Sequence, residues 1–126
     1  MKQQTILYPF AINGDNIDSF SNTLELAKAK KAKVLCFSCV GIGKIDDAYL
    51  HLLQLNGHYQ SNFTDWRQTT MPPIEKNIVI GPFNKQLRQL LETSTIDIVI
   101  QQNYLEAVDW NQIAPLAELV CFEEDF

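Results

Sequence analysis

Short apolar runs alternate with amphipathic stretches along the whole chain. The apolar runs are rich in β-branched and aromatic residues, which favour strands, and they cover residues 5–10, 33–40, 77–80, 96–100 and 118–122. Between them, apolar side chains recur three and four positions apart, as on one face of a helix, over about residues 17–31, 46–56, 82–92 and, more weakly, 104–114. The pattern therefore predicts five strands that alternate with four helices.

This alternation predicts the fold class. Residues 77–102 read as a strand, a helix and a second strand. One face of this helix is expected to carry Phe83, Leu87, Leu90 and Leu91. Such a unit forms a right-handed crossover between parallel strands. Repeated over the chain, it predicts an α/β domain: a doubly wound, five-stranded parallel sheet of order 3-2-1-4-5 with helices on both faces, Rossmann-like. We expect one domain over residues 1–126, which is too short for two.

The stretch after residue 45 leaves two points open. Its apolar residues predict a buried stripe of Ile45, Tyr49, Leu52 and Leu53. Gly57 either ends this helix or lies inside a longer one, where glycine costs about 1 kcal/mol relative to alanine. The segment from His58 to Pro73 is aromatic without a clear period; it either packs over the protein's own core or covers a partner, since aromatic residues, Met and Arg are enriched at interfaces.

A ligand of a doubly wound sheet binds beside the carboxyl ends of the strands where the winding reverses, here the first and fourth. The residues that follow these strands, with the end of the second, are the candidate cleft: Phe10, Ala11, Asn13, Cys39, Val40, Gln101, Gln102 and Asn103. Amide and thiol side chains could bind a neutral or adenine-like ligand by hydrogen bonds. They provide no evident nucleophile and base pair, so we assign no catalytic residue and expect no enzyme.

Charge restricts the partners. The net charge of −5 and the pI near 4.8 give a surface that repels phosphate backbones and anionic lipids, so we expect no nucleic acid and no membrane partner. The basic cluster Lys28, Lys30, Lys31 and Lys33 lies where cations complement the negative end of a helix dipole. The apolar stretch near the amino terminus is too short for a signal peptide or a membrane span, which predicts a cytoplasmic protein.

The three cysteines fit the same compartment. Cys36, Cys39 and Cys121 lie in apolar, strand-like contexts, which suits reduced, buried thiols better than disulfides. The pair Cys36 and Cys39 is formally a C-x-x-C motif, but inside a strand its two side chains lie on opposite faces. His51 and His58 add no recognised ligand spacing, so we expect no metal and no cofactor.

Several segments together resemble the universal stress protein family over nearly the whole chain. They are the strand ILYPF, the helix end LELAKAKKAK, the strand VLCFSCV, the unit NIVIGPFNKQLRQLLETSTIDIVIQ and the closing APLAELVCF. The resemblance implies an adenine nucleotide alpha hydrolase-like α/β fold and a homodimer that pairs through the last strand. It places Leu119, Val120, Cys121 and Phe122 at that interface.

The chain departs from the nucleotide-binding branch of that family at two places. The branch has an aspartate directly after the first strand, where Ala11 stands here. It also has a glycine-rich loop after the fourth strand, whereas this chain has no glycine after Gly81. Both the anchor for the ring and the backbone amides that would bind phosphate are therefore missing.

These departures lead to two hypotheses about function. In the first, the chain is a non-catalytic, universal-stress-protein-like domain that has lost the ATP site and acts in stress response as a homodimeric or partner-binding module. In the second, it binds an unidentified small ligand, which could be nucleotide-like, in a rebuilt cleft at the carboxyl ends of the first and fourth strands.

Overall fold

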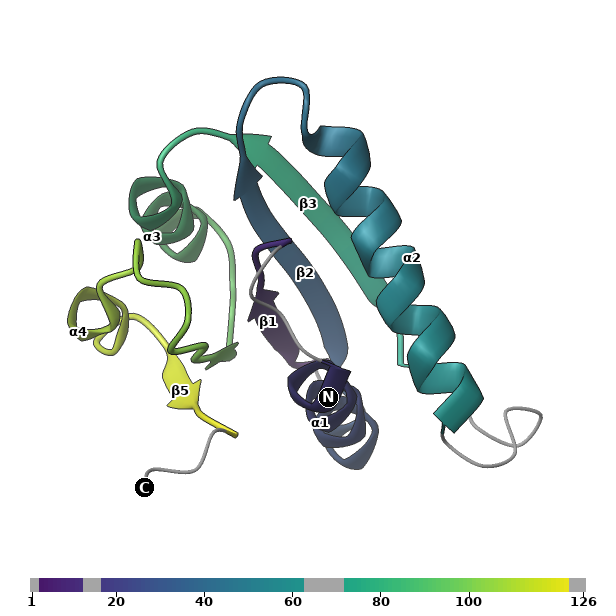
Figure 1. The fold of residues 1–126 in the computed structure, drawn as a ribbon. Coiled ribbons are helices and arrows are strands. Elements are labelled where there is room, and N and C mark those ends of the chain that lie inside the picture. Colours follow the sequence, from purple (N-terminus) through teal and green to yellow (C-terminus); the bar gives the residue numbers. More distant parts are fainter. Residues whose placement is uncertain (1–2, 13–16, 63–71, 123–126) are drawn as a thin grey trace.

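The computed structural model describes residues 3–12, 17–62 and 72–122, and these form one sheet flanked by helices (Figure 1). The strands are β1 (Thr5–Pro9), β2 (Lys33–Val40), β3 (Ile74–Ile80), β4 (Ile98–Ile100) and β5 (Glu118–Val120). The helices are α1 (Ile17–Lys30), α2 (Ile45–Asn62), α3 (Phe83–Thr93) and α4 (Trp110–Ile113). All strand pairs are parallel and the order is β3-β2-β1-β4-β5, which confirms the predicted fold class.

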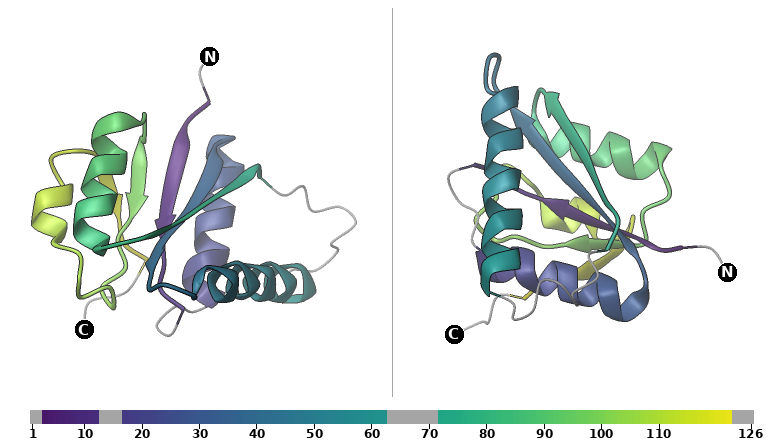
Figure 2. Two further views of the ribbon diagram at one scale, coloured as in Figure 1. Left: turned by 90° about the horizontal axis from the view of Figure 1, so that it is seen from above. Right: turned by 90° about the vertical axis from the view of Figure 1, so that its right-hand side faces the viewer.

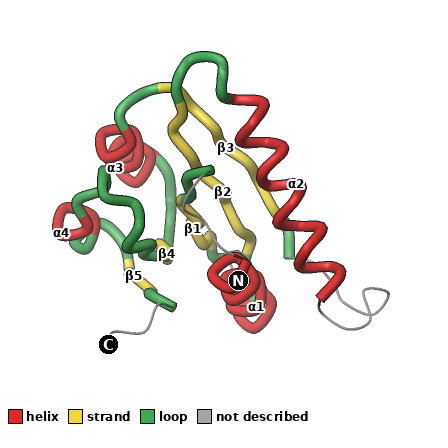
Figure 3. Tube along the Cα trace, in the orientation of Figure 1, coloured by secondary structure: helices red, strands yellow, loops and turns green. Residues whose placement is uncertain are grey.

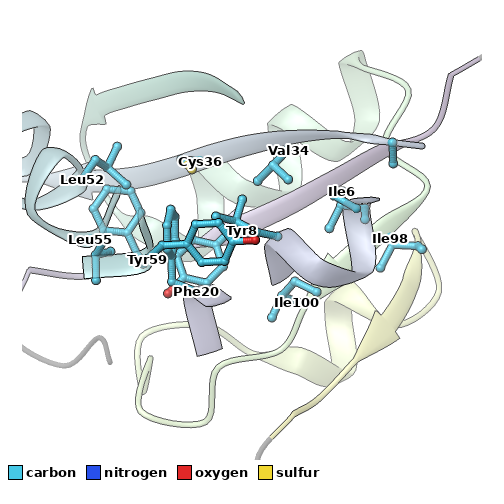
Figure 4. Close-up of a cluster of buried hydrophobic side chains, with 14 of the residues drawn as sticks. Ile6, Tyr8, Phe20, Val34, Cys36, Leu52, Leu55, Tyr59, Ile98 and Ile100 are labelled. Carbon is cyan, nitrogen blue, oxygen red and sulfur yellow. The ribbon is translucent and has the colours of Figure 1, made fainter. Parts of the chain in front are cut away.

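Helices lie on both sides of the sheet (Figure 2), and an apolar cluster lies on each of its faces. On one face, Ile6 and Tyr8 of β1 pack with residues of α1 and α2, among them Phe20 and Leu55, as the close-up of this cluster shows (Figure 4). On the other face, Leu7 packs with residues of α3 and of the segment after β4. Because consecutive residues of β1 are buried on opposite faces, the strand has no polar side, as expected for a central parallel strand.

Element boundaries differ from the expectation at both edges of the sheet. β3 begins at Ile74 rather than Asn77, because the extended backbone after Pro72 already pairs with β2, with the Val34 amide donating to the Pro73 carbonyl at 2.8 Å. The predicted helix over residues 104–114 shortens to α4, which Asp109 caps by accepting from the Asn111 amide at 3.1 Å. The tube in Figure 3 shows the loop that replaces its first half.

Helix α2 decides whether Gly57 ends the helix or lies inside it. It continues through Gly57 to Asn62, and the residues that it buries are Ala48, Leu52, Leu55 and Tyr59. The predicted stripe is wrong for Tyr49 and Leu53, which are 37% and 58% exposed. The longer helix is turned so that Tyr59 reaches α1, where its hydroxyl donates to Glu25 at 2.8 Å.

Residues 63–71 of the aromatic segment lie outside the described part of the chain. Among the helices that the structure describes, none combines the length and apolarity that crossing a lipid bilayer requires.

Candidate functional site

The junction between β1 and β4, where the winding reverses, is filled by the side chain of Gln102. This side chain is fully buried. Its amide nitrogen donates to the Pro9 carbonyl at 3.1 Å, and its amide oxygen accepts from the Ser19 hydroxyl at 2.8 Å. Gln102 therefore joins the end of β1, the first turn of α1 and the loop after β4.

Tyr104 closes the same junction from the other side. Its hydroxyl accepts a hydrogen bond from the backbone amide of Ala11 at 3.1 Å, and its ring packs against the core cluster that includes Leu7. Together with the Phe10 amide, which donates to the Phe37 carbonyl at 3.0 Å, the first two backbone donors after β1 are thus satisfied inside the protein. A ligand at this junction would have to displace a protein group to use it.

Phe10 belongs to the core. Its side chain is fully buried, and its ring stacks on that of His51 with centroids 5.8 Å apart and planes at 20°. Its carbonyl accepts from the buried Ser38 hydroxyl at 2.7 Å. Phe10 thus links the end of β1 to β2 and α2. Because its side chain is fully buried, it is part of the core and offers no contact surface to a ligand.

An open cleft lies on the other side of β1, between the ends of β1 and β2 and the start of α2. Its volume is about 410 Å³. The lining residues are Ala11, Ile12, Ser38, Cys39, Val40, Gly41, Lys44 and Asp47. Of the predicted cleft residues, Ala11, Cys39 and Val40 therefore share one cavity, but it is formed by β1 and β2 instead of β1 and β4.

The chemistry of this cleft suits binding better than catalysis. Burial raises the pKa of the Cys39 thiol from 9.0 to about 12, so the thiol stays protonated and weakly nucleophilic near neutral pH. The Ser38 hydroxyl is engaged with the Phe10 carbonyl. At the rim, the exposed Lys44 ammonium lies 3.7 Å from the Asp47 carboxylate, an ion pair that contributes little to stability in water.

Gln101 and Asn103 lie outside the open cleft, next to β5. The Gln101 side-chain amide donates to the Asn103 carbonyl oxygen at 3.0 Å, and the Asn103 amide lies 3.8 Å from the Cys121 sulfur. The remaining predicted residue, Asn13, lies outside the described residues. The three consecutive polar residues after β4 thus have different surroundings: Gln102 points inward, while Gln101 and Asn103 face the edge strand.

The predicted dimer residues form the edge of the sheet. Leu119 and Val120 belong to β5 and are half-buried, Cys121 is exposed, and Phe122 packs on the core cluster of α1. The Glu118 amide and the Val120 carbonyl both bond toward the β4 side. Because these groups alternate along a strand, the backbone groups of Leu119 point outward, where another strand could bind them.

Sequence patterns did not single out Ser19 at the filled junction, or Lys44 and Asp47 at the open one. Their hydrogen bonds and positions depend on segments far apart in the chain. One signal was available, since Lys44 and Asp47 flank the start of a helix directly after the glycine turn that ends β2. Among the described residues, no group of three His, Cys, Asp or Glu side chains could hold a metal ion.

Comparisons with known proteins identify the fold. No protein-family model matches the sequence, and no curated protein matches it. Two solved structures are similar over nearly their whole length. A universal stress protein crystallised in complex with cAMP has a TM-score of 0.68 and 16% sequence identity, covering 96% of this chain and 97% of that one. The universal stress protein UspA from Lactobacillus plantarum has a TM-score of 0.55 and 15% identity, covering 98% and 99%.

The chain therefore has the universal stress protein fold, as the resemblance in sequence implied.

Proposed function

We propose that this protein is a cytoplasmic, universal-stress-protein-like domain without the family's ATP site. In this proposal it acts in stress response by associating with other protein chains, first of all with a second copy of itself, and it catalyses no reaction. Cys36 is buried and Cys39 is half-buried, which suits thiols that stay reduced in a reducing compartment.

The buried side chain of Gln102 is the observation that carries this proposal. Its side chain lies at the junction of β1 and β4 and forms two hydrogen bonds there, one to Pro9 and one to Ser19. Beside it, the Tyr104 hydroxyl accepts a hydrogen bond from the Ala11 amide. Binding a triphosphate there would break these bonds, and the loop after β4 has no glycine to bring backbone amides to the phosphates.

Equilibrium dialysis with labelled ATP and Mg²⁺ tests the loss of the ATP site. We expect no saturable binding up to millimolar nucleotide. Saturable binding in the micromolar range would overturn this part of the proposal. An unrelated ATP-binding protein, dialysed in parallel, shows that the labelled nucleotide is intact.

Self-association through β5 needs a separate measurement. Sedimentation equilibrium should show a species heavier than the monomer at micromolar concentration, because β5 turns the backbone groups of Leu119 outward at the edge of the sheet. Proline cannot donate to a neighbouring strand, so Cys121→Pro should weaken this association, while Cys121→Ser should not. Equal masses for the two variants at every concentration would count against β5 as the interface.

A second candidate function is the binding of a small, nucleotide-like ligand in the open cleft. Two observations favour it: the cavity of about 410 Å³ beside Ala11 and Cys39, and the similar fold of the universal stress protein whose structure contains cAMP. The walls from Ile12 and Val40 suit a flat, weakly polar group, whereas the described lining residues supply a single cation, Lys44, for a phosphate.

Amide chemical-shift titrations with cAMP, adenosine and ATP test this candidate. If the cleft binds the ring, adenosine and cAMP should shift the amides of Ala11 and Val40 with similar affinity, and ATP should bind no more tightly. The Cβ of any residue that replaced Gly41 would meet no atom within 4 Å, so Gly41→Leu should partly fill the cleft without strain and reduce the shifts. Absence of shifts with all three ligands would reject the candidate.

A further inference from the structure

We infer that the outer face of α2 is a contact surface for a second copy of this chain, with the two α2 helices packed antiparallel about a two-fold axis near Leu53. This surface lies at the β3 side of the sheet, at the opposite edge from β5 (Figure 1). It is thus distinct from the interface proposed above and does not depend on it.

The exposed apolar side chains of the described residues gather at this side of the molecule. Six large hydrophobic residues are notably exposed, and five of them lie on α2, in the loop before it or at the end of β3: Ile42 (89%), Tyr49 (37%), Leu50 (55%), Leu53 (58%) and Ile80 (47%). Ile80 shares the α2 face of the sheet with Ile78, two residues earlier. Exposed apolar side chains that gather on one side of a molecule are typical of interaction sites.

Gly57 gives a second, independent indication. It lies inside α2 without a positive φ, and a Cβ at this position would meet no atom within 4 Å. Neither the backbone conformation nor the packing of the described residues therefore requires glycine at position 57. Its presence is notable because glycine destabilises the interior of a helix. Gly57 lies four positions after Leu53 and seven after Leu50, so the three residues share one face of the helix.

This spacing is self-complementary. An antiparallel pair of α2 helices centred near Leu53 places Leu50 of each protomer opposite Gly57 of the partner subunit. The missing side chain leaves a hollow for the leucine, as in the packing of ridges into grooves. The only charged residues of α2 are Asp46 and Asp47 in its first turn; antiparallel packing keeps these carboxylates at opposite ends of the interface, whereas parallel packing would bring them together.

The available surface suits a weak dimer. A helix of 18 residues is about 27 Å long and about 10–12 Å across. With Ile42 and Ile80 at one end, the strip amounts to several hundred Å² on each protomer, in the range of weak interfaces that bury less than about 1,200 Å² in total. We therefore expect a second copy to bind this face with micromolar or weaker affinity.

Sedimentation equilibrium from low to high micromolar concentration tests the inference, with Cys121→Pro as the common background so that any association through β5 is weakened equally in every variant. We expect a monomer and dimer equilibrium. Leu53→Lys should raise its dissociation constant at least about tenfold, because the variant loses apolar burial at the axis and brings two charges together. Leu116→Lys, at the sixth exposed hydrophobic position, is the matched control and should leave the constant unchanged within about twofold.

Substitutions of Gly57 separate the interface from the helix. Gly57→Ala should raise the urea midpoint of the monomer, because alanine favours the helix, yet it should weaken association because the hollow becomes shallower. Gly57→Leu should weaken association further. A monomer at all concentrations, equal effects of Leu53→Lys and Leu116→Lys, or unchanged association of Gly57→Leu would each overturn the inference.

Discussion

The carboxyl edge of the sheet differs on the two sides of β1. Between β1 and β4, the Gln102 side chain and the Tyr104 hydroxyl occupy the junction and bond the surrounding backbone. Between β1 and β2, a cleft of about 410 Å³ stays open above Ser38 and Cys39. Both spaces lie at the ends of parallel strands, where ligands of such sheets usually bind. Strand order alone therefore locates possible ligand sites, and individual side chains decide which of them remain open.

The largest expected effect comes from placing a charge in the filled junction. Gln102→Glu should lower the free energy of unfolding by about 3 kcal/mol or more at pH 8, because a buried carboxylate would face the Pro9 carbonyl instead of donating to it. Urea denaturation measures the loss. Gln101→Glu, on the neighbouring, partly exposed residue, should stay within about 0.5 kcal/mol of the parent chain.

The pH dependence of the Gln102→Glu variant sharpens this test. Burial raises the pKa of a carboxyl above its unfolded value. The stability of the variant should therefore be closest to that of the parent below the unfolded pKa of about 4.3, and it should fall as the pH rises, when only the unfolded chain ionises freely. If the difference in stability between the variant and the parent chain does not change with pH, the introduced carboxylate is solvated and the junction is not closed.

A smaller effect is expected from the hydroxyl that closes the junction. Tyr104→Phe removes the acceptor of the Ala11 amide and should cost about 1–2 kcal/mol. Hydrogen exchange of the Ala11 amide should accelerate in this variant. Tyr49→Phe, on the exposed face of α2, serves as the control and should change neither quantity. An unchanged exchange rate at Ala11 would contradict the closure by Tyr104.

The hydrogen bond of Ser38 at the floor of the open cleft should contribute less to stability than that of Tyr104. Ser38→Ala removes the donor to the Phe10 carbonyl, and we expect a loss of about 1 kcal/mol, because water in the adjacent cleft can partly replace the hydroxyl. Thermal or urea unfolding measures it, with the exposed Ser94→Ala as the control. A loss larger than that of Tyr104→Phe would argue that the cleft is dry.

The Cys39 thiol is expected to have the smallest effect on stability. Its burial is tested by the rate at which the thiol is alkylated. With a pKa of about 12, its thiolate fraction at pH 8 is about a thousandfold below that of a thiol at the ordinary 9.0. Iodoacetamide should therefore label the exposed Cys121 long before Cys39, as mass spectrometry of the peptides would show. Equal labelling rates would contradict the burial of Cys39.

The same pKa shift predicts a pH dependence of stability. A thiol whose folded pKa is raised favours the folded state fully below the unfolded value of 9.0, and this contribution is lost as the pH rises from 9 toward 12. The Cys39→Ser variant lacks the titrating thiol. The difference in free energy of unfolding between this variant and the parent chain should therefore change as the pH rises from 9 toward 12.

The fold could be predicted because its signals are local. The period of apolar residues in α3, with Phe83, Leu87 and Leu91 buried, and the apolar run of β2 each reflect burial of one short segment. The rotation of α2 was not predictable in this way. Several apolar residues of α2 offered alternative stripes, and the contact of Tyr59 with Glu25 on α1 selected the one that leaves Leu53 exposed.

The candidate site was predicted only in part. Ala11, Cys39 and Val40 do line one cavity, since all three follow or end adjacent parallel strands. The direction of Gln102 could not be read from the sequence, because Gln101 and Asn103 have similar side chains and face the other way. The difference depends on Ser19 and Pro9, which lie 83 and 93 residues away in the chain.

The sequence by itself determined the order of strands and helices, the parallel sheet and the absence of glycines after β4, because periodicity and backbone freedom are properties of neighbouring residues. Only the tertiary structure decided that Gln102 fills one junction, that the other stays open and that α2 exposes Leu50, Leu53 and Gly57 on one face. These outcomes depend on contacts between residues that are far apart in the sequence. Buried polar atoms need hydrogen-bond partners, and the fold decides which partners lie within reach.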